Sequence, residues 1–159
     1  MNKENLLKKY AIKYLSKFDS SKKNLERILK NKIKRLNNLE KKEKYFLYNN
    51  IKKIIDDLET NKFINDKNYA ESKLRLYAMI GKSKNYIINY LIMKGIEKTI
   101  IEEIFENYES NNPDWEIESI KIFIRKKNIN FNDETKTEKN FSKLSRAGFN
   151  YNLIKKLYK

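Results

Sequence analysis

Basic and aromatic side chains alternate through the central part of this chain. The cations are Lys73, Arg75, Lys82, Lys84 and Lys94, and the rings among them are Tyr77, Tyr86 and Tyr90. Ammonium and guanidinium groups neutralise phosphates, and tyrosine rings can stack on exposed bases. We expect the cations as a group to contact a polyanion or an acidic protein. For each tyrosine taken singly we expect a position in the core. The alternative for the lysines is that they only keep the chain in solution.

Two shorter motifs offer catalytic chemistry in principle. The tripeptide Gly81-Lys82-Ser83 resembles the end of a phosphate-binding loop, but that loop needs a glycine where Leu76 stands. Glu102, Glu103 and Glu106 could hold Mg²⁺, although a solvated helix face explains them more simply, because the segment offers no further ligands. We therefore expect no enzymatic activity, no cofactor and no metal site.

The composition favours a packed helical protein. Hydrophobic residues make up 40% of the 159 residues and aromatic residues 13%, which argues against wholesale disorder. Only 3 glycines and 1 proline are present, too few for the many turns of a sheet protein. The chain has no cysteine and no histidine, which excludes disulfides and metal sites built from either residue.

The net charge of +15 points to an anionic partner. Residues 1–59 carry 17 basic and 8 acidic side chains, residues 60–112 carry 8 and 7, and residues 113–159 carry 11 and 6. Codon bias toward lysine and asparagine would explain part of this excess. No apolar run approaches the roughly 20 residues of a membrane span, and the first residues lack the apolar core of a signal peptide. We expect a soluble, cytoplasmic protein that does not contact a membrane.

One helical signature occurs three times. Its central copy consists of Ile87, Tyr90, Leu91, Lys94, Gly95, Ile96, Ile100, Ile101 and Ile104. A second copy follows 53 residues later, with Leu144, Gly148, Phe149, Leu153, Ile154 and Leu157. The first half also appears 62 residues earlier, as Leu25, Ile28, Leu29 and Lys32. Such a fixed register predicts stacked copies of one small helical unit, which favours an extended binding surface over an enzyme pocket.

The repeat predicts an all-α fold of three tandem three-helix repeats, about nine helices in an elongated, curved array. We expect the repeats to span residues 1–62, 63–110 and 111–159. In the first repeat, 16 extra residues separate the second and third helices, near the basic stretch 34–44 that contains Lys34 and Arg35. Insertions in repeat proteins often lie on a binding face, although a solvated loop with an extra helical turn explains this one equally well.

Polar residues mark several expected helix starts. Asp19, Ser20 and Ser21 can cap the helix that follows them, and Asn65 or Asp66 can cap a later one. Gly81 and Ser83 mark the start of the helix that carries the central signature. Thr99 with Glu102 predicts a capping box. Asn112 followed by Pro113 predicts a further helix start.

The chain resembles the RecX family in four places that follow one another in the family's order. Residues 63–70, Phe-Ile-Asn-Asp-Lys-Asn-Tyr-Ala, resemble the hallmark L-D-D-x-x-F/Y-A, with Asn65 in place of its first aspartate. Ile87, Leu91 and the triplet 94–96 resemble I-x-x-x-L-x-x-K-G-I/V. The segments 14–29 and 144–149 resemble the start of one branch of the family and the closing motif, which includes Arg146.

The resemblance implies a modular helical protein without catalytic activity that binds the RecA recombinase. Members of the family bind along the groove of the RecA filament on single-stranded DNA and inhibit strand exchange, ATP hydrolysis and co-protease activity. We expect a monomer whose partner is this filament, with single-stranded DNA close by. Lys34, Arg35 and Arg146 join the five central cations as candidate partner-binding residues. Lysine stands where relatives often carry arginine, and it lacks the planar two-pronged grip on carboxylates.

Two other functions remain open from the residues alone. One is a general nucleic-acid-binding helical protein that acts without RecA, which the charge alone would motivate. The other is a helical scaffold whose charge reflects only codon usage. Reversal of the central lysines would change binding in the first case and not in the second.

Overall fold

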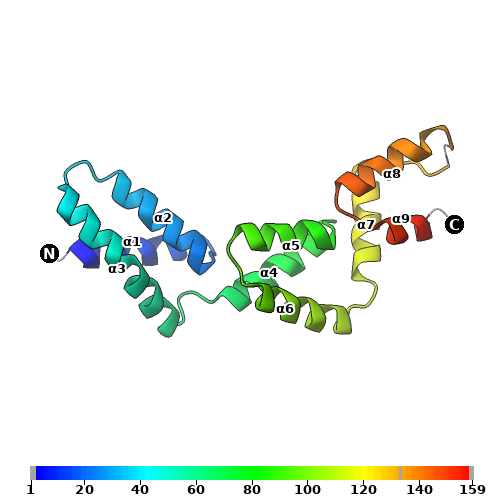
Figure 1. Ribbon diagram of the computed structural model, residues 1–159. Coiled ribbons are helices and arrows are strands. Elements are labelled where there is room, and N and C mark those ends of the chain that lie inside the picture. Colours follow the sequence, from blue (N-terminus) through cyan, green and yellow to red (C-terminus); the bar gives the residue numbers. More distant parts are fainter. Residues whose placement is uncertain (1–2, 133, 158–159) are drawn as a thin grey trace. The chain divides into compact units, whose positions relative to one another are not determined.

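The computed structural model describes residues 3–132 and 134–157, and within these ranges every regular element is a helix (Figure 1). The elements are α1 (Lys3–Leu15), α2 (Lys22–Lys34), α3 (Lys41–Thr60), α4 (Asp66–Met79), α5 (Lys84–Met93), α6 (Lys98–Asn111), α7 (Trp115–Lys126), the 3₁₀ turn η1 (Glu134–Lys136), α8 (Thr137–Arg146) and α9 (Tyr151–Leu157). The described part of the chain thus confirms the all-α expectation, with nine α-helices and no strand.

The chain divides into two compact units. The first contains residues 1–69 together with the short segment 94–96, and the second contains residues 70–93 and 97–159. The boundary passes through α4, close to its N-terminus. The repeat limits 1–62, 63–110 and 111–159 stay a prediction.

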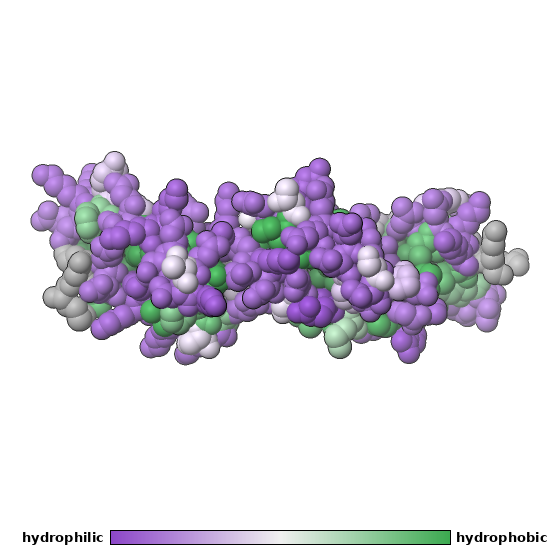
Figure 2. Space-filling model, turned by 90° about the horizontal axis from the view of Figure 1, so that it is seen from below, coloured by the Kyte–Doolittle hydropathy of each residue, from purple (hydrophilic) through white to green (hydrophobic). Residues whose placement is uncertain are grey.

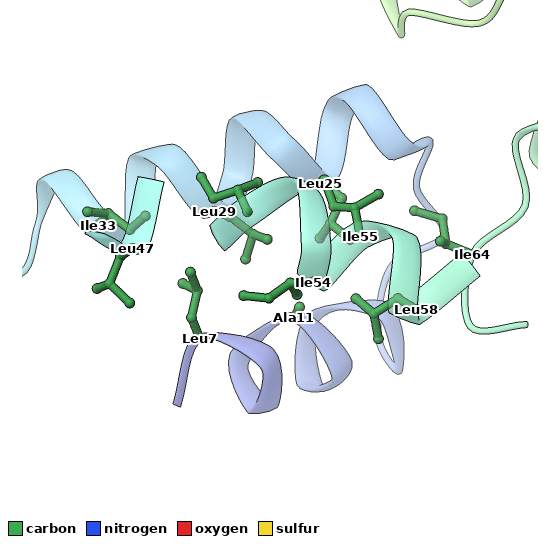
Figure 3. Packing of buried hydrophobic residues seen from close by; sticks show 11 residues of the cluster. Leu7, Ala11, Leu25, Leu29, Ile33, Leu47, Ile54, Ile55, Leu58 and Ile64 are labelled. Atoms are coloured by element: carbon green, nitrogen blue, oxygen red, sulfur yellow. The ribbon is translucent and has the colours of Figure 1, made fainter. Parts of the chain in front are cut away.

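The first unit is built around the amphipathic helix α2. Leu25, Leu29 and Ile33 recur every four residues, so they form one face of α2, and each is completely buried. This face packs against buried side chains of α1 and α3 (Figure 3). From α3 the core receives Leu47, Ile51, Ile54, Ile55 and Leu58, and from α1 it receives Leu7 and Ala11. The polar side chains of α2 lie on its other faces, so lysine, asparagine, glutamate and arginine occupy most of the remaining positions.

The repeated signature marks equivalent core positions. Leu29, Leu91 and Leu144 stand at matching places in the three copies, and each is 0% exposed. At the position of Leu25 and Ile87 the third copy has Asn140, which is also buried. Its side-chain amide donates a hydrogen bond to the Asn130 carbonyl oxygen at 2.9 Å, which satisfies the polar group inside the core.

The extra residues of the first repeat are mostly helical. α3 begins 13 residues before Ile54, whereas α6 begins two residues before the matching Ile100. α2 is three residues longer than α5, and the connection 35–40 is two residues longer than the connection 94–97. The insertion therefore lengthens two packed helices and adds little loop.

The expected helix starts are confirmed at some positions and wrong at others. Ser21 and Ser83 cap α2 and α5, and the Asn65 side chain accepts a hydrogen bond from the Asn68 N–H at 2.9 Å. The capping box at Thr99 is wrong, because the N-cap of α6 is Glu97.

The start at Asn112 and Pro113 is also wrong, because α7 begins at Trp115. Asn112 instead serves the end of α6, where its side-chain amide donates to the Tyr108 carbonyl oxygen at 3.0 Å.

None of the helices in the described ranges combines the length and the apolar character needed to cross a lipid bilayer. Figure 2 shows hydrophilic side chains over most of the face that it presents, with smaller hydrophobic areas between them.

Candidate interaction surface

The N-terminus of α5 is fixed by a buried serine that makes two hydrogen bonds. Ser83 Oγ accepts the Tyr86 N–H at 3.2 Å and donates to the Ala147 carbonyl oxygen at 2.7 Å. Beside it, Asn85 Nδ2 donates to the Gly148 carbonyl oxygen at 3.0 Å. The start of α5 is therefore joined to the end of α8, within the second unit.

Lys84 is engaged on three sides in the same region. Its backbone N–H donates to Glu116 Oε1 at 2.9 Å, and its ammonium group lies 2.6 Å from Glu109 Oε1. The same ammonium nitrogen lies 5.2 Å from the centre of the Phe105 ring. Lys84 thus helps to hold α5 against α6 and α7, and its charge is compensated inside the unit.

Glu116 is a half-buried carboxyl group whose protonation is coupled to folding. Burial raises the pKa of Glu116, and the neighbouring carboxylate of Glu109 raises it further, while the backbone N–H and the charge of Lys84 oppose the rise. The folded protein therefore binds this proton more tightly than the unfolded chain does. The stability that Glu116 contributes is present at acid pH and is lost as pH rises through its raised pKa.

Substitutions of Glu116 separate its charge from its hydrogen bond. Glu116→Gln keeps an oxygen for the Lys84 N–H and removes the titration, so we expect near-normal stability without this pH-dependent loss. Glu116→Ala leaves that N–H without its acceptor and should cost about 1–2 kcal/mol. Urea unfolding of both variants over a range of acid to neutral pH measures the difference. Equal stability of the alanine variant and the parent protein would contradict the expected role.

The start of α2 repeats this arrangement within the first unit. Ser21 Oγ accepts the Asn24 N–H at 3.2 Å and donates to the Lys94 carbonyl oxygen at 2.5 Å, and the Lys22 N–H donates to Asp66 Oδ1 at 2.8 Å. Sequence reasoning missed these paired junctions. The signal was present, because Ser21 and Ser83 are 62 residues apart, which is the offset of the repeat. At the matching place in the third copy the helix cap is Lys136, which makes no side-chain capping bond.

Glycines make the close approach at both junctions possible. Gly95 has φ 77°, and a Cβ there would lie 2.5 Å from the Lys23 Cβ. Gly148 has φ 90°, and a Cβ there would lie 2.6 Å from Ser83 Oγ. Both positions therefore require glycine for backbone conformation and for space.

A groove of about 300 Å³ lies between the outer face of α5 and the end of α8, in the second unit. We call it the tyrosine groove. Its walls are formed by Asn85, Tyr86, Asn89, Tyr90, Met93, Arg146, Ala147 and Gly148. The α5 residues among them are spaced to share the face opposite the buried Ile87 and Leu91. This mixture offers ring faces, side-chain amides and one guanidinium group to a partner.

The three tyrosines of the central segment form one cluster beside this groove. The Tyr77 ring centre lies 4.8 Å from that of Tyr90 and 5.5 Å from that of Tyr86, both edge to face. Burial, followed by the hydrogen bond with Tyr90, raises the pKa of Tyr77 well above its usual value, so its hydroxyl stays neutral. Tyr77 and Tyr90 are half-buried and support the cluster, whereas Tyr86 is 38% exposed.

Two of the predicted cations lie at this cluster and groove. The Lys82 ammonium nitrogen lies 4.3 Å from the centre of the Tyr86 ring, a cation–π contact on an exposed aromatic. Arg146 is exposed at the end of α8, where its Nε donates to the Ser142 carbonyl oxygen at 3.2 Å. Sequence reasoning singled out Lys82, Tyr86 and Arg146 but missed Asn85, Asn89 and Met93, which periodicity on α5 could have placed on the same face.

The other predicted cations are not among the residues that line the groove. Lys73 and Arg75 lie on α4, and Arg75 pairs weakly with Glu71 at 3.8 Å. Lys94 belongs to the first unit, where its carbonyl oxygen accepts a hydrogen bond from the Ser21 hydroxyl. The exposed Lys34 and Arg35 lie at the opposite end of α2, about 20 Å from that junction at 1.5 Å per helical residue.

Repeated helical units with a surface groove of rings, amides and cations are typical of proteins that bind extended macromolecular partners. The structure is similar to the crystal structure of RecX from Lactobacillus salivarius, with a TM-score of 0.68 and 26% identity over 96% of this chain and 92% of that chain. The sequence is 34% identical over 111 residues to Regulatory protein RecX of Clostridium acetobutylicum, which covers 69% of this chain and 49% of that protein. It is 24% identical over 157 residues to Regulatory protein RecX of Myxococcus xanthus, which covers 95% of this chain and 83% of that protein.

The chain belongs to the RecX family. The match to the Clostridium acetobutylicum protein spans about half of that protein's length. No protein-family model matches the chain.

Proposed function

We propose that this chain is a regulator that binds the RecA recombinase on single-stranded DNA and inhibits its ATP hydrolysis, strand exchange and co-protease activity. The observation that carries the proposal is the similarity to two proteins named Regulatory protein RecX together with the fold match over nearly the whole chain. The protein acts without chemistry of its own, as a monomer in the cytoplasm, by occupying the path of incoming duplex and of cleavage substrates.

The tyrosine groove supports this proposal as the contact surface of the second unit. Lys82 and Arg146 would meet phosphates or carboxylates, and the exposed Tyr86 ring would stack on a base or pack on a side chain. Residues 1–62, 63–110 and 111–159 would act as three binding modules. Weak contacts from several modules on one filament sum through their high effective concentration.

The test is ATP hydrolysis by the cognate RecA on single-stranded DNA, titrated with this protein at fixed salt. We expect suppression at or below an equal molar ratio. The double variant Lys82→Glu/Arg146→Glu should need about tenfold or more protein for the same suppression, because the groove cation Arg146 and the Lys82 cation on the Tyr86 ring both become repulsive. The matched control Arg125→Glu/Lys139→Glu makes the same charge change at exposed positions of α7 and α8 and should behave like the parent protein.

Two results would contradict the proposal. One is unchanged hydrolysis with no binding to RecA filaments at moderate salt. The other is binding to naked single-stranded DNA as tight as binding to the filament, with a salt slope of about 0.7 per phosphate contacted, which would favour a general nucleic-acid-binding protein. Loss of activity in the control double variant would show that overall charge, and not the groove, governs binding.

A further inference from the structure

The first unit contains an apolar pocket that the proposed function does not use. Its volume is about 380 Å³, and it lies where α1 meets the end of α2 and the start of α3. Leucines form most of its wall, namely Leu6 and Leu7 from α1, Leu36 and Leu39 from the α2–α3 connection, and Leu47 from α3. Tyr10 and Lys32 also line it. We call this the leucine pocket.

The inserted segment of the first repeat builds this pocket. Leu36, Leu39 and Leu47 all lie between Lys32, which matches Lys94, and Ile54, which matches Ile100. The second repeat has 16 fewer residues in that interval. The insertion therefore does more than enlarge the core, because Leu36 and Leu39 of the connection and Leu47 of α3 add to a concave apolar surface that remains open. Leu6, on its wall, is 47% exposed.

The segment that contributes Lys32, Leu36 and Leu39 to the leucine pocket is strongly basic. Residues 30–44 contain seven lysines and arginines and two glutamates. Both glutamates serve the backbone in the capping box at the start of α3, where Glu43 accepts the Glu40 N–H at 3.0 Å. The Lys32 ammonium nitrogen lies 5.1 Å from the centre of the Tyr10 ring, and both residues line the pocket. A ligand at this site meets leucine side chains inside and Lys32 on the wall, and the chain just after Lys32 carries the exposed cations Lys34 and Arg35.

We propose that the leucine pocket is a docking site for an acidic peptide segment of a partner protein. A leucine or phenylalanine of that segment would insert among Leu6, Leu36 and Leu39, and flanking carboxylates would face Lys32, Lys34 and Arg35. The apolar anchor in a pocket supplies most of the affinity, and the complementary charges supply orientation and fast association. This site goes beyond the proposed function, because that function rests on the tyrosine groove of the second unit and assigns no ligand to the leucine pocket.

The experiment uses the full chain and a short fluorescein-labelled peptide of glutamates and aspartates that carries one leucine and one phenylalanine a helical turn apart. Fluorescence anisotropy should show saturable binding. A second peptide with serines at both apolar positions, and a third with lysines in place of all acidic residues, should bind about tenfold or more weakly. Leu6→Glu should weaken binding of the first peptide by a similar factor, because it places a repulsive carboxylate in the pocket wall.

Matched variants separate the pocket from general surface effects. Leu76 on α4 is also 47% exposed and does not line the pocket, so Leu76→Glu should leave peptide binding unchanged. Lys32→Met should weaken binding, whereas Lys52→Met, at an exposed position of α3, should not. Far-UV circular dichroism confirms that each variant is folded. Amide chemical-shift changes on peptide addition should concentrate in α1 and in residues 32–47.

Several outcomes would overturn the proposal. One is that the acidic peptide with leucine and phenylalanine does not bind, and another is that the serine peptide binds as tightly. A third is that Leu6→Glu and Leu76→Glu weaken peptide binding equally. The last is that the chemical-shift changes centre on the tyrosine groove. If single-stranded DNA fully displaced the peptide that has serines at both apolar positions, the cations of this segment would be a binding site for nucleic acid. None of these results bears on RecA inhibition, which the hydrolysis assay tests separately through Lys82 and Arg146.

Discussion

Replacing Leu91 by alanine should lower the free energy of unfolding by about 2–5 kcal/mol. Leu91 is 0% exposed and shares the inner face of α5 with Ile87, which is also completely buried. Removing its branched end leaves a cavity in a small helical unit that has few alternative ways to pack. The loss includes both the transfer of apolar surface and the unfilled volume, so it belongs among the largest effects that a single substitution can have.

The neighbouring residue provides the control for this measurement. Ile92 is 57% exposed, and Ile92→Ala should change stability by about 0.5 kcal/mol or less. Because the chain forms two compact units, urea unfolding is best followed together with amide hydrogen exchange of α5, which reports the second unit directly. Similar losses in Leu91→Ala and Ile92→Ala would mean that the register of the repeat is wrong.

Gly81→Ala should also be strongly destabilising, by about 2–4 kcal/mol. Gly81 has φ 86°, a conformation in which an L side chain is strained. A Cβ there would lie 3.0 Å from the Phe123 backbone nitrogen and 3.1 Å from the Ser119 carbonyl oxygen. Backbone atoms of α7 cannot turn away as a side chain can, so the end of α4 would have to separate from α7.

Gly148 offers an internal comparison for Gly81. The atom closest to an added Cβ at Gly148 is Ser83 Oγ, a side-chain atom that Ser83→Ala removes. Gly148→Ala should therefore cost less in the Ser83→Ala background than in the parent protein, leaving mainly the conformational strain. No single side-chain deletion should rescue Gly81→Ala to the same degree. Thermal unfolding of the four variants measures this order, and an equally small effect at both glycines would contradict the close packing of α4 on α7.

These two predictions concern features that the sequence reveals to different degrees. The periodic signature identified Leu91 and Leu144 as core residues, because burial of one helix face imposes its spacing directly on the sequence. The same signature located Gly95 and Gly148 at helix ends, where glycine adopts the positive φ of a helix terminus. That Gly81 approaches the backbone of α7 has no local signature, because the two segments are distant in the chain.

The two candidate surfaces, the tyrosine groove and the leucine pocket, could also be predicted from the sequence only in part. Sequence reasoning singled out Lys82, Tyr86 and Arg146, but nothing local distinguishes them from Lys84, whose charge the structure pairs with Glu109. A lysine on a helix is solvated or paired according to what packs beside it. The leucine pocket could not be predicted from the sequence either. Some of its residues look like ordinary apolar positions of helices, and the others lie in an insertion that has two plausible explanations.

The sequence by itself determined that this protein is all-helical, repetitive, strongly basic and free of cysteine and histidine chemistry, and its motifs indicated the RecX family. These properties depend on composition and on short-range periodicity, which local backbone geometry enforces within a few residues. The tertiary structure alone decided which cations are compensated and which remain at the tyrosine groove. It also decided that the inserted residues form helices around a pocket, and that Ser21 and Ser83 join helix starts to distant carbonyl groups. Such contacts depend on the three-dimensional packing of segments far apart in the chain, which no local pattern records.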